Sequence, residues 1–179
     1  MEAKFSQRVK DVLSYSREEA LRLGNDYIGL EHLLLGILRD GEGKAIQIMH
    51  FFGIDLKELR KTIELSIANS DRKIKNADNL PLVKQAERAL KITYLEAKLF
   101  NSDLIGTEHL LLSILKDENN IVTKVFGKMG IDYDSIKDEL KTMMSRKDTD
   151  ERVNPLNELP GDAADEEEET GRGGFGGNV

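Results

Sequence analysis

The sequence has no cysteine, and only 3 of its 179 residues are proline. Without cysteine there can be no disulfide framework, thiol nucleophile or thiolate metal site, which fits a cytoplasmic protein. No apolar run approaches the roughly 18 residues that a membrane-spanning helix needs. The first twelve residues carry charges throughout and lack the apolar segment of a signal peptide. We therefore expect a cytoplasmic protein with no membrane partner.

Basic residues are outnumbered by acidic ones, 26 to 33, so the chain carries a formal net charge of −7. Four basic and ten acidic residues follow position 144, so most of the negative charge belongs to the C-terminal segment. The preceding part is close to neutral. It has no basic face of the kind that phosphate backbones require, so we do not expect nucleic acid as a partner.

Alternating strand patterns are missing, and the dominant signal is an internal repeat. Ile28–Asp40 reads IGLEHLLLGILRD, and Ile105–Asp117 reads IGTEHLLLSILKD. The offset is 77 residues, and it holds without a gap from Phe5 to Leu140. Such a duplication predicts a pseudo-two-fold body, in which polar residues kept in both copies are candidates for paired sites.

Helical periodicity and capping residues recur in both copies. Gly24 and its counterpart Asn101 are the two residue types that best end a helix in the left-handed conformation. Asp55 and Asp132 stand where N-caps are expected. Four helices fit in each copy, and the leucine triplets after each Glu-His pair are expected in the core. We therefore predict an all-α fold, a tandem duplication of a four-helix unit with pseudo-two-fold symmetry.

The domain boundaries follow from the same pattern. We predict one domain over residues 1–144, made of repeat one at about 3–68, a polar connector at 69–80 and repeat two at about 81–144. Residues 145–179 are acidic and glycine-rich, with few apolar side chains to offset the entropy of ordering, so we expect a flexible linker there.

Two tandem four-helix units, each with Ile-Gly-x-Glu-His-Leu-Leu-Leu, resemble the N-terminal domain of the Clp ATPases. The segments Glu19–Gly24 and Arg39–Gly43, with GTEHLLL in the second copy, look most like the ClpC branch. The resemblance implies a module that docks substrate and adaptor proteins on a hexameric AAA+ unfoldase, which feeds the ClpP protease. The isolated domain is expected to be a monomer, because its halves bury each other's apolar faces.

The motor itself is not expected in this chain. The nearest match to a Walker A loop begins at Gly36 and has Glu42 where lysine is required. ATP and magnesium are therefore expected only in ATPase modules outside this sequence, and the chain is not expected to be an enzyme. The alternative to an unfoldase domain is a free-standing Clp-N protein that regulates a Clp protease. An enzyme that uses the Glu-His pairs is a third hypothesis.

Glu31 and Glu108 are the candidate ligand-binding residues, each in the first turn of a predicted helix. A carboxylate there is stabilised by the helix dipole in any case. It can also pair with a guanidinium beside amides that bind anions. Members of the ClpC branch use such glutamates for phosphoarginine. Thr107 can add a hydroxyl in the second copy, whereas Leu30 cannot in the first, so the second copy is the favoured site.

His32 and His109 suggest metal binding at first sight. Adjacent residues on a helix point about 100° apart, so each Glu-His pair does not face one ion together, and His-Glu-x-x-His is absent. We predict a capping or packing role for both histidines, and no metal or other cofactor in this chain.

Overall fold

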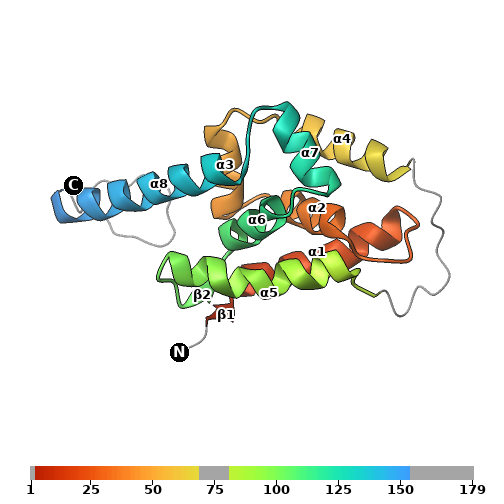
Figure 1. Ribbon diagram of the computed structural model, residues 1–179, viewed down its shortest axis with the longest axis horizontal. Coiled ribbons are helices and arrows are strands. Elements are labelled where there is room, and N and C mark those ends of the chain that lie inside the picture. The colour runs from red at the N-terminus through yellow and green to blue at the C-terminus, as the bar shows by residue number, and fades with distance from the viewer. Residues whose placement is uncertain (1–2, 69–80, 154–179) are drawn as a thin grey trace. The chain divides into compact units, whose positions relative to one another are not determined.

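The computed structural model describes residues 3–68 and 81–153, which contain eight helices and two short strands (Figure 1). The helices are α1 (Gln7–Arg22), α2 (Leu30–Asp40), α3 (Lys44–Phe51), α4 (Leu56–Ala68), α5 (Lys84–Leu99), α6 (Thr107–Lys116), α7 (Ile121–Lys128) and α8 (Tyr133–Val153). The strands are β1 (Lys4–Phe5) and β2 (Leu104–Ile105). The order α1–α4 repeats as α5–α8, which confirms the predicted duplication of a four-helix unit.

The chain divides into two compact units, Met1–Lys137 and Asp138–Val179. The first contains both copies of α1–α3, together with α4 and the start of α8. The predicted linker start at residue 145 differs from the structure, because α8 continues to Val153. No proline or glycine interrupts this stretch before Pro155, which cannot extend a helix. The connector at 69–80 and the segment 154–179 lie outside the described residues.

Capping residues end and begin these helices as the repeat predicts. Gly24 and Asn101 both adopt the left-handed conformation, with φ of 74° and 53°. The Asp55 carboxylate accepts hydrogen bonds from the backbone of Lys57 and Glu58, and Asp132 accepts one from Ser135. The ends of α1 and α5 and the starts of α4 and α8 therefore carry their own capping residues, at equivalent positions in the two copies.

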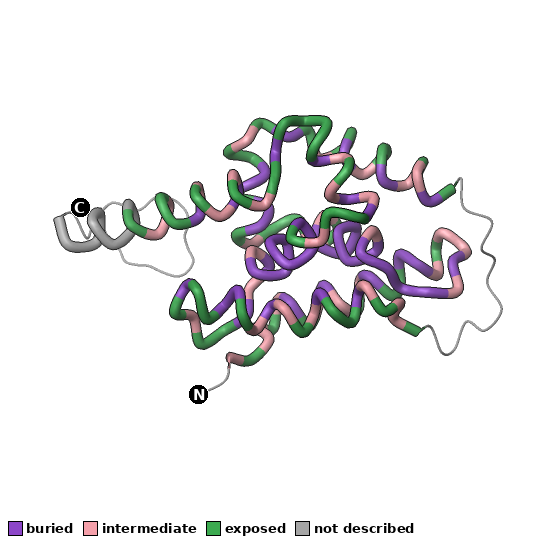
Figure 2. Tube along the Cα trace, viewed as in Figure 1, coloured by how far each residue is buried: buried purple, intermediate pink, exposed green. Residues whose placement is uncertain are grey.

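Helices α2 and α6 form the centre of the first unit. Figure 1 shows them between α1 and α5 on one side and α3, α4 and α7 on the other. Figure 2 shows almost continuous burial along both helices. They contact each other, and each also packs on helices of the other copy: α2 on α5 and α7, α6 on α1 and α3. The leucine triplets Leu33–Leu35 and Leu110–Leu112 are buried in this centre, as predicted.

Two short parallel pairings also tie the copies together, although the sequence shows no strand pattern. β1 pairs with β2, and Ser6 N–H donates to the Ile105 carbonyl over 3.0 Å. The counterpart is an isolated bridge between Ile28 and Leu82, where Val83 N–H donates to the Ile28 carbonyl over 3.0 Å. In each pairing, the segment before the first helix of one copy bonds to the segment before the second helix of the other copy.

Proline explains why the second pairing is shorter than the first. Lys4 N–H donates to the Asp103 carbonyl at 3.1 Å. The residue equivalent to Lys4 is Pro81, which has no N–H to donate. The ladder therefore loses one bond on that side, and the pairing remains a single bridge.

In each copy, a buried glutamate on the first helix contacts polar side chains of the second and fourth helices of that copy. Glu19 on α1 accepts from Arg22 at 2.8 Å and Arg60 at 2.9 Å, and it lies 3.5 Å from Arg39. Its counterpart Glu96 on α5 accepts from the Tyr133 hydroxyl at 2.8 Å and lies 3.4 Å from Lys116. Burial opposes the charge of Glu19, but the two arginines together hold its pKa below the usual value.

Gly36 on α2 allows α1 to approach closely. A Cβ at this position would overlap the Ser16 hydroxyl and lie 2.6 Å from the Val12 carbonyl oxygen. We expect Gly36→Ala to destabilise the fold by about 1–3 kcal/mol, because overpacking outweighs the gain in helix propensity of about 1 kcal/mol. The free energy of unfolding in urea is the measurement.

Gly127 on α7 provides the matched control. A Cβ there meets nothing within 4 Å, so Gly127→Ala should stabilise the protein by about 0.5 kcal/mol through helix propensity alone. Equal stability of the two variants would contradict the close α1–α2 packing.

Candidate functional site

The first turns of α2 and α6 share one arrangement. Gly29 and Gly106 are the N-cap residues, and neither contributes a side-chain cap. The Gly29 N–H donates to His32 Nδ1 at 3.0 Å, and the Gly106 N–H donates to His109 Nδ1 at 2.9 Å. The histidines therefore fill the role that glutamate or glutamine has in a capping box. This is the predicted capping role.

The glutamates of this turn lie close over the glycine two residues before them. A Cβ on Gly29 would lie 2.6 Å from Glu31 Oε1, and a Cβ on Gly106 would overlap Glu108 Oε1. Each carboxylate therefore folds back over its N-cap residue. Backbone strain is not the reason for glycine here, since φ is −109° at Gly29 and −95° at Gly106. Capping by the histidine, together with the carboxylate folded over the glycine, accounts for the Gly-x-Glu-His spacing in structural terms.

Both histidines are enclosed. The His32 Nε2 lies 2.7 Å from Asn25 Oδ1, and the ring meets the edge of Tyr27. His109 packs against Phe100. Burial lowers the pKa of both imidazoles below the ordinary value, despite the opposing effect of the adjacent glutamates. Neutral imidazole is therefore the stable form, with Nδ1 free to accept the glycine N–H.

The two glutamates have different partners. Glu31 accepts a hydrogen bond from the Tyr27 hydroxyl at 3.1 Å. Glu108 instead lies 3.8 Å from the Lys44 ammonium, which belongs to α3 of the first copy. The Glu108 side chain is 12% exposed and the Lys44 side chain 45% exposed, so the pair can be reached from solvent. The residue equivalent to Lys44 is Ile121, so the first copy has no such cation.

Thr107, predicted to offer its hydroxyl to a ligand, has a different role in the structure. It is buried, and its Oγ1 accepts the Ala45 N–H at 3.1 Å. It therefore caps α3 across the boundary between copies. Gly43, the N-cap residue of α3, makes room for it: a Cβ there would lie 3.0 Å from Thr107 Oγ1, and φ is +93°.

In the second copy, the equivalent helix α7 is capped by its own N-cap residue. Asn120 replaces Gly43, and its side chain accepts the Thr123 N–H at 2.9 Å to cap α7. Leu30, the counterpart of Thr107, is buried. The helix cap is therefore supplied from α6 in one half and from the residue at the helix start in the other.

The sequence did not predict Lys44 beside Glu108, because the two residues belong to different copies of the repeat. The difference between Lys44 and Ile121 at equivalent positions is the signal that could have revealed it. We define the second-copy site as Lys44, Thr107 and Glu108.

Other kinds of site find no geometric support in the described ranges. Within residues 3–68 and 81–153, no three His, Asp or Glu side chains gather as metal ligands. No helix of the described chain is both long enough and apolar enough to cross a membrane.

The arrangement of duplicated helices and capped Gly-x-Glu-His turns agrees with a known family. The family model of the Clp repeat (R) N-terminal domain matches residues 4–123 and 96–160. The chain belongs to this family. This Clp N-domain is 28% identical over 149 residues to the negative regulator of genetic competence ClpC/MecB of Bacillus subtilis, covering 83% of the chain and 18% of the relative.

Other relatives show how widely this domain is shared. The chaperone protein ClpB of Oceanobacillus iheyensis is 26% identical, over 83% of the chain and 18% of the relative. The crystal structure of the N-terminal domain of ClpD from Arabidopsis thaliana matches with a TM-score of 0.62 and 20% identity. That match covers 79% of this chain and 94% of the other, and it establishes the shared fold. The Clp N-domain thus spans about a fifth of the length of these curated relatives.

The buried histidines predict a loss of stability in mild acid. Their pKa values are lowered in the folded state, so below the ordinary value of about 6.5 the unfolded chain binds more protons. Stability should be fully present above about pH 7 and should fall as the pH drops from about 6.5 towards the lowered pKa values. Urea unfolding between about pH 8 and pH 5 measures this, above the range where carboxylates such as Glu19 titrate.

The control uses glutamine, which can accept the same glycine N–H but does not titrate. The double variant His32→Gln, His109→Gln should show a flatter pH profile, whatever its absolute stability. His50→Gln, at an exposed histidine on α3, should keep the wild-type slope. A wild-type profile that is flat across this range would contradict the argument.

Thr107→Val tests the shared helix cap. Valine keeps the shape but removes the oxygen that accepts the Ala45 N–H, so the free energy of unfolding should fall by about 0.5–2 kcal/mol. Thr62→Val, at an exposed position on α4, should change it by no more than about 0.5 kcal/mol. An equal effect of the two changes would refute the capping role.

Proposed function

We propose that this Clp N-domain docks substrates and adaptor proteins for a ClpC-like unfoldase, and that phosphoarginine binds at the second-copy site. The segments Glu19–Gly24 and Arg39–Gly43, together with the similarity to ClpC/MecB, support the choice of branch. The ATPase modules and the delivery to ClpP belong to sequence beyond this domain. The proposal for phosphoarginine is carried by one observation, the accessible Glu108–Lys44 pair.

The chemistry of phosphoarginine matches that pair. Its phosphate is bonded to a guanidinium nitrogen, so negative and positive groups lie side by side in one ligand. Glu108 can accept charge-assisted hydrogen bonds from the guanidinium N–H groups. Lys44 can donate to the phosphate oxygens. A ligand that carries both groups replaces the existing ion pair without leaving either partner uncompensated.

The structure also favours Lys44 over Thr107 as the phosphate partner. The Thr107 hydroxyl already accepts from the α3 backbone and is buried. The Lys44 ammonium is nearly half exposed and lies 3.8 Å from the Glu108 carboxylate, a distance at which an ion pair is easily opened. Arg8 is committed elsewhere, since it pairs with Asp40 at 2.8 Å.

The first copy lacks the complete arrangement. Glu31 is hydrogen-bonded to Tyr27, and Ile121 stands where the second-copy site has its lysine. We therefore propose one phosphoarginine site in this domain, at Glu108, with Glu31 contributing little.

Calorimetric titration with free phosphoarginine tests this function. Glu108→Ala and Lys44→Ala should each weaken binding at least tenfold, since each removes a charge-assisted contact of about 1.5–3 kcal/mol. Glu31→Ala should leave the affinity nearly unchanged. The stability loss of Glu108→Ala should not exceed about 1 kcal/mol, because the variant loses a helix-terminus contact and a long ion pair to a half-exposed lysine.

Free arginine separates the two halves of the site. It should bind more weakly than phosphoarginine, and Lys44→Ala should not weaken it, because arginine carries no phosphate. Lys44→Arg should retain phosphoarginine binding. Absence of wild-type binding at about millimolar phosphoarginine would sink the phosphoarginine proposal and leave adaptor docking as the function of the domain.

A further inference from the structure

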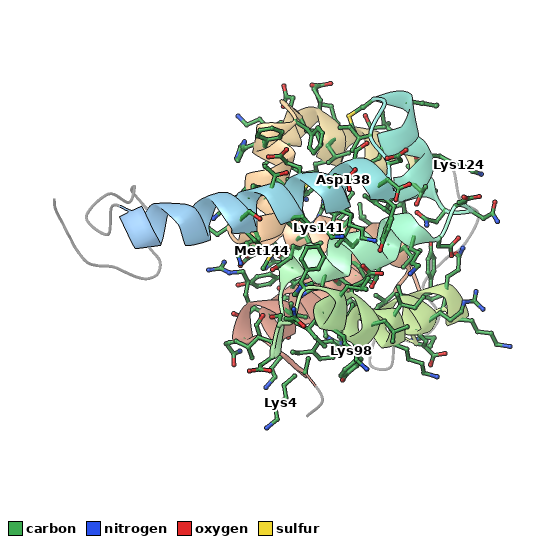
Figure 3. All side chains as sticks on the ribbon, turned by 60° about the vertical axis from the view of Figure 1, so that its left-hand side comes forward. Lys4, Lys98, Lys124, Asp138, Lys141 and Met144 are labelled. Atoms are coloured by element: carbon green, nitrogen blue, oxygen red, sulfur yellow. The ribbon has the colours of Figure 1, made fainter. Side chains whose placement is uncertain are left out.

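The solvent-facing side of α5 carries an unusual combination of side chains. We define the α5 outer face as four lysine or arginine residues and three aliphatic residues: Lys84, Arg88, Lys91, Lys98, Ile92, Leu95 and Leu99. Leu95 and Leu99 are 59% and 53% exposed, one helical turn apart. Figure 3 shows Lys98 with Lys4 at the lower edge of the view, both on the outside of the first unit.

The cations of this face have no ion-pair partner in the part of the chain that the structure describes. Lys84, Arg88, Lys91 and Lys98 are exposed, and no salt bridge joins any of them to an acid in the described ranges 3–68 and 81–153. α5 has one exposed acidic residue, Glu87, because Glu96 is buried against Tyr133 and Lys116. The face is therefore positive as well as apolar.

The duplicated helix α1 provides an internal comparison. The residues equivalent to Leu95 and Leu99 are Glu18 and Arg22. Glu18 pairs with Arg39 at 2.7 Å, and Arg22 pairs with Glu19 and Glu64 at 2.8 and 2.6 Å. The same two positions of the fold therefore hold ion-paired side chains in the first copy and exposed leucines in the second. Packing of the domain does not require leucine there.

We infer that the α5 outer face docks an acidic amphipathic helix of a partner protein. Two leucines one turn apart match the apolar stripe of such a helix, and the four cations, which pair with no acid of the described residues, match acidic residues beside that stripe. This inference rests on the proposed docking function and gives it a location and a partner chemistry. The face is separate from the second-copy site, which lies at the start of α6.

A synthetic peptide provides the probe. It has about 15 residues, enough for an isolated helix to begin to form, with leucines three and four positions apart and glutamates elsewhere. Fluorescence anisotropy with the full chain should show binding below about 0.1 mM at low salt and weaker binding at about 0.5 M NaCl. A scrambled peptide of equal composition and a peptide with lysine in place of glutamate should bind at least tenfold more weakly.

Variants of α5 locate the surface. Leu95→Glu combined with Leu99→Glu should weaken peptide binding at least tenfold, and so should Arg88→Glu combined with Lys91→Glu at low salt. Leu65→Glu, at an exposed leucine on α4, and Lys124→Glu, at an exposed lysine on α7, are matched controls that should bind as wild type does. Figure 3 shows Lys124 at the opposite side of the view from Lys98.

Several outcomes would overturn the inference. These are equal binding of the scrambled peptide, no loss in either α5 variant, or an α5 variant that loses a dimer present in wild type. Binding to anionic lipid vesicles without binding to the acidic peptide would identify a membrane surface instead. Phosphoarginine titration of the α5 variants should match wild type, and Glu108→Ala should bind the peptide normally. Failure here is therefore distinguishable from failure of the phosphoarginine site.

Discussion

The fold depends on the mutual burial of α2 and α6. Each of these helices is buried on nearly every side, and helices of both copies cover it. The helices α5 and α7 complete the surroundings of α2, and α1 and α3 complete those of α6. The outer helices pack around these two helices, and the exchanged backbone pairings and the site at the start of α6 lie at their N-terminal ends.

Duplication gives the domain two equivalent halves, and the differences between them are where each half acquires its own chemistry. Gly43 with Thr107 and Asn120 with Leu30 are alternative ways to cap one helix start. Lys44 against Ile121 decides which glutamate has a cation nearby. The outer face of α1 forms ion pairs through Glu18 and Arg22, whereas α5 has Leu95 and Leu99 at the equivalent positions. These substitutions leave the order of the helices unchanged, because they lie at helix starts and on outer faces.

The sequence predicts whatever is encoded locally. The 77-residue offset, the left-handed Gly24 and Asn101, and the Asp55 and Asp132 caps locate the helices, because each depends on a few neighbouring residues. The β1–β2 pairing could not be predicted in this way, since it joins segments about a hundred residues apart and involves only two residues on each side. The capping role of Thr107 and the proximity of Lys44 to Glu108 could not be predicted for the same reason. Their partners belong to the other copy, and no pattern within one copy reveals them.

The reciprocal backbone pairing bears on how such a domain can arise. The segment before α1 completes the turn before α6, and the segment before α5 completes the turn before α2. A chain with a single repeat could form these bonds only with a second molecule, as in a symmetric dimer with exchanged arms. Joining two repeats in one chain converts that bimolecular assembly into an intramolecular one, with an effective concentration set by the linker and not by expression level. Once fused, the two halves are also free to diverge separately, which a dimer of identical chains does not allow.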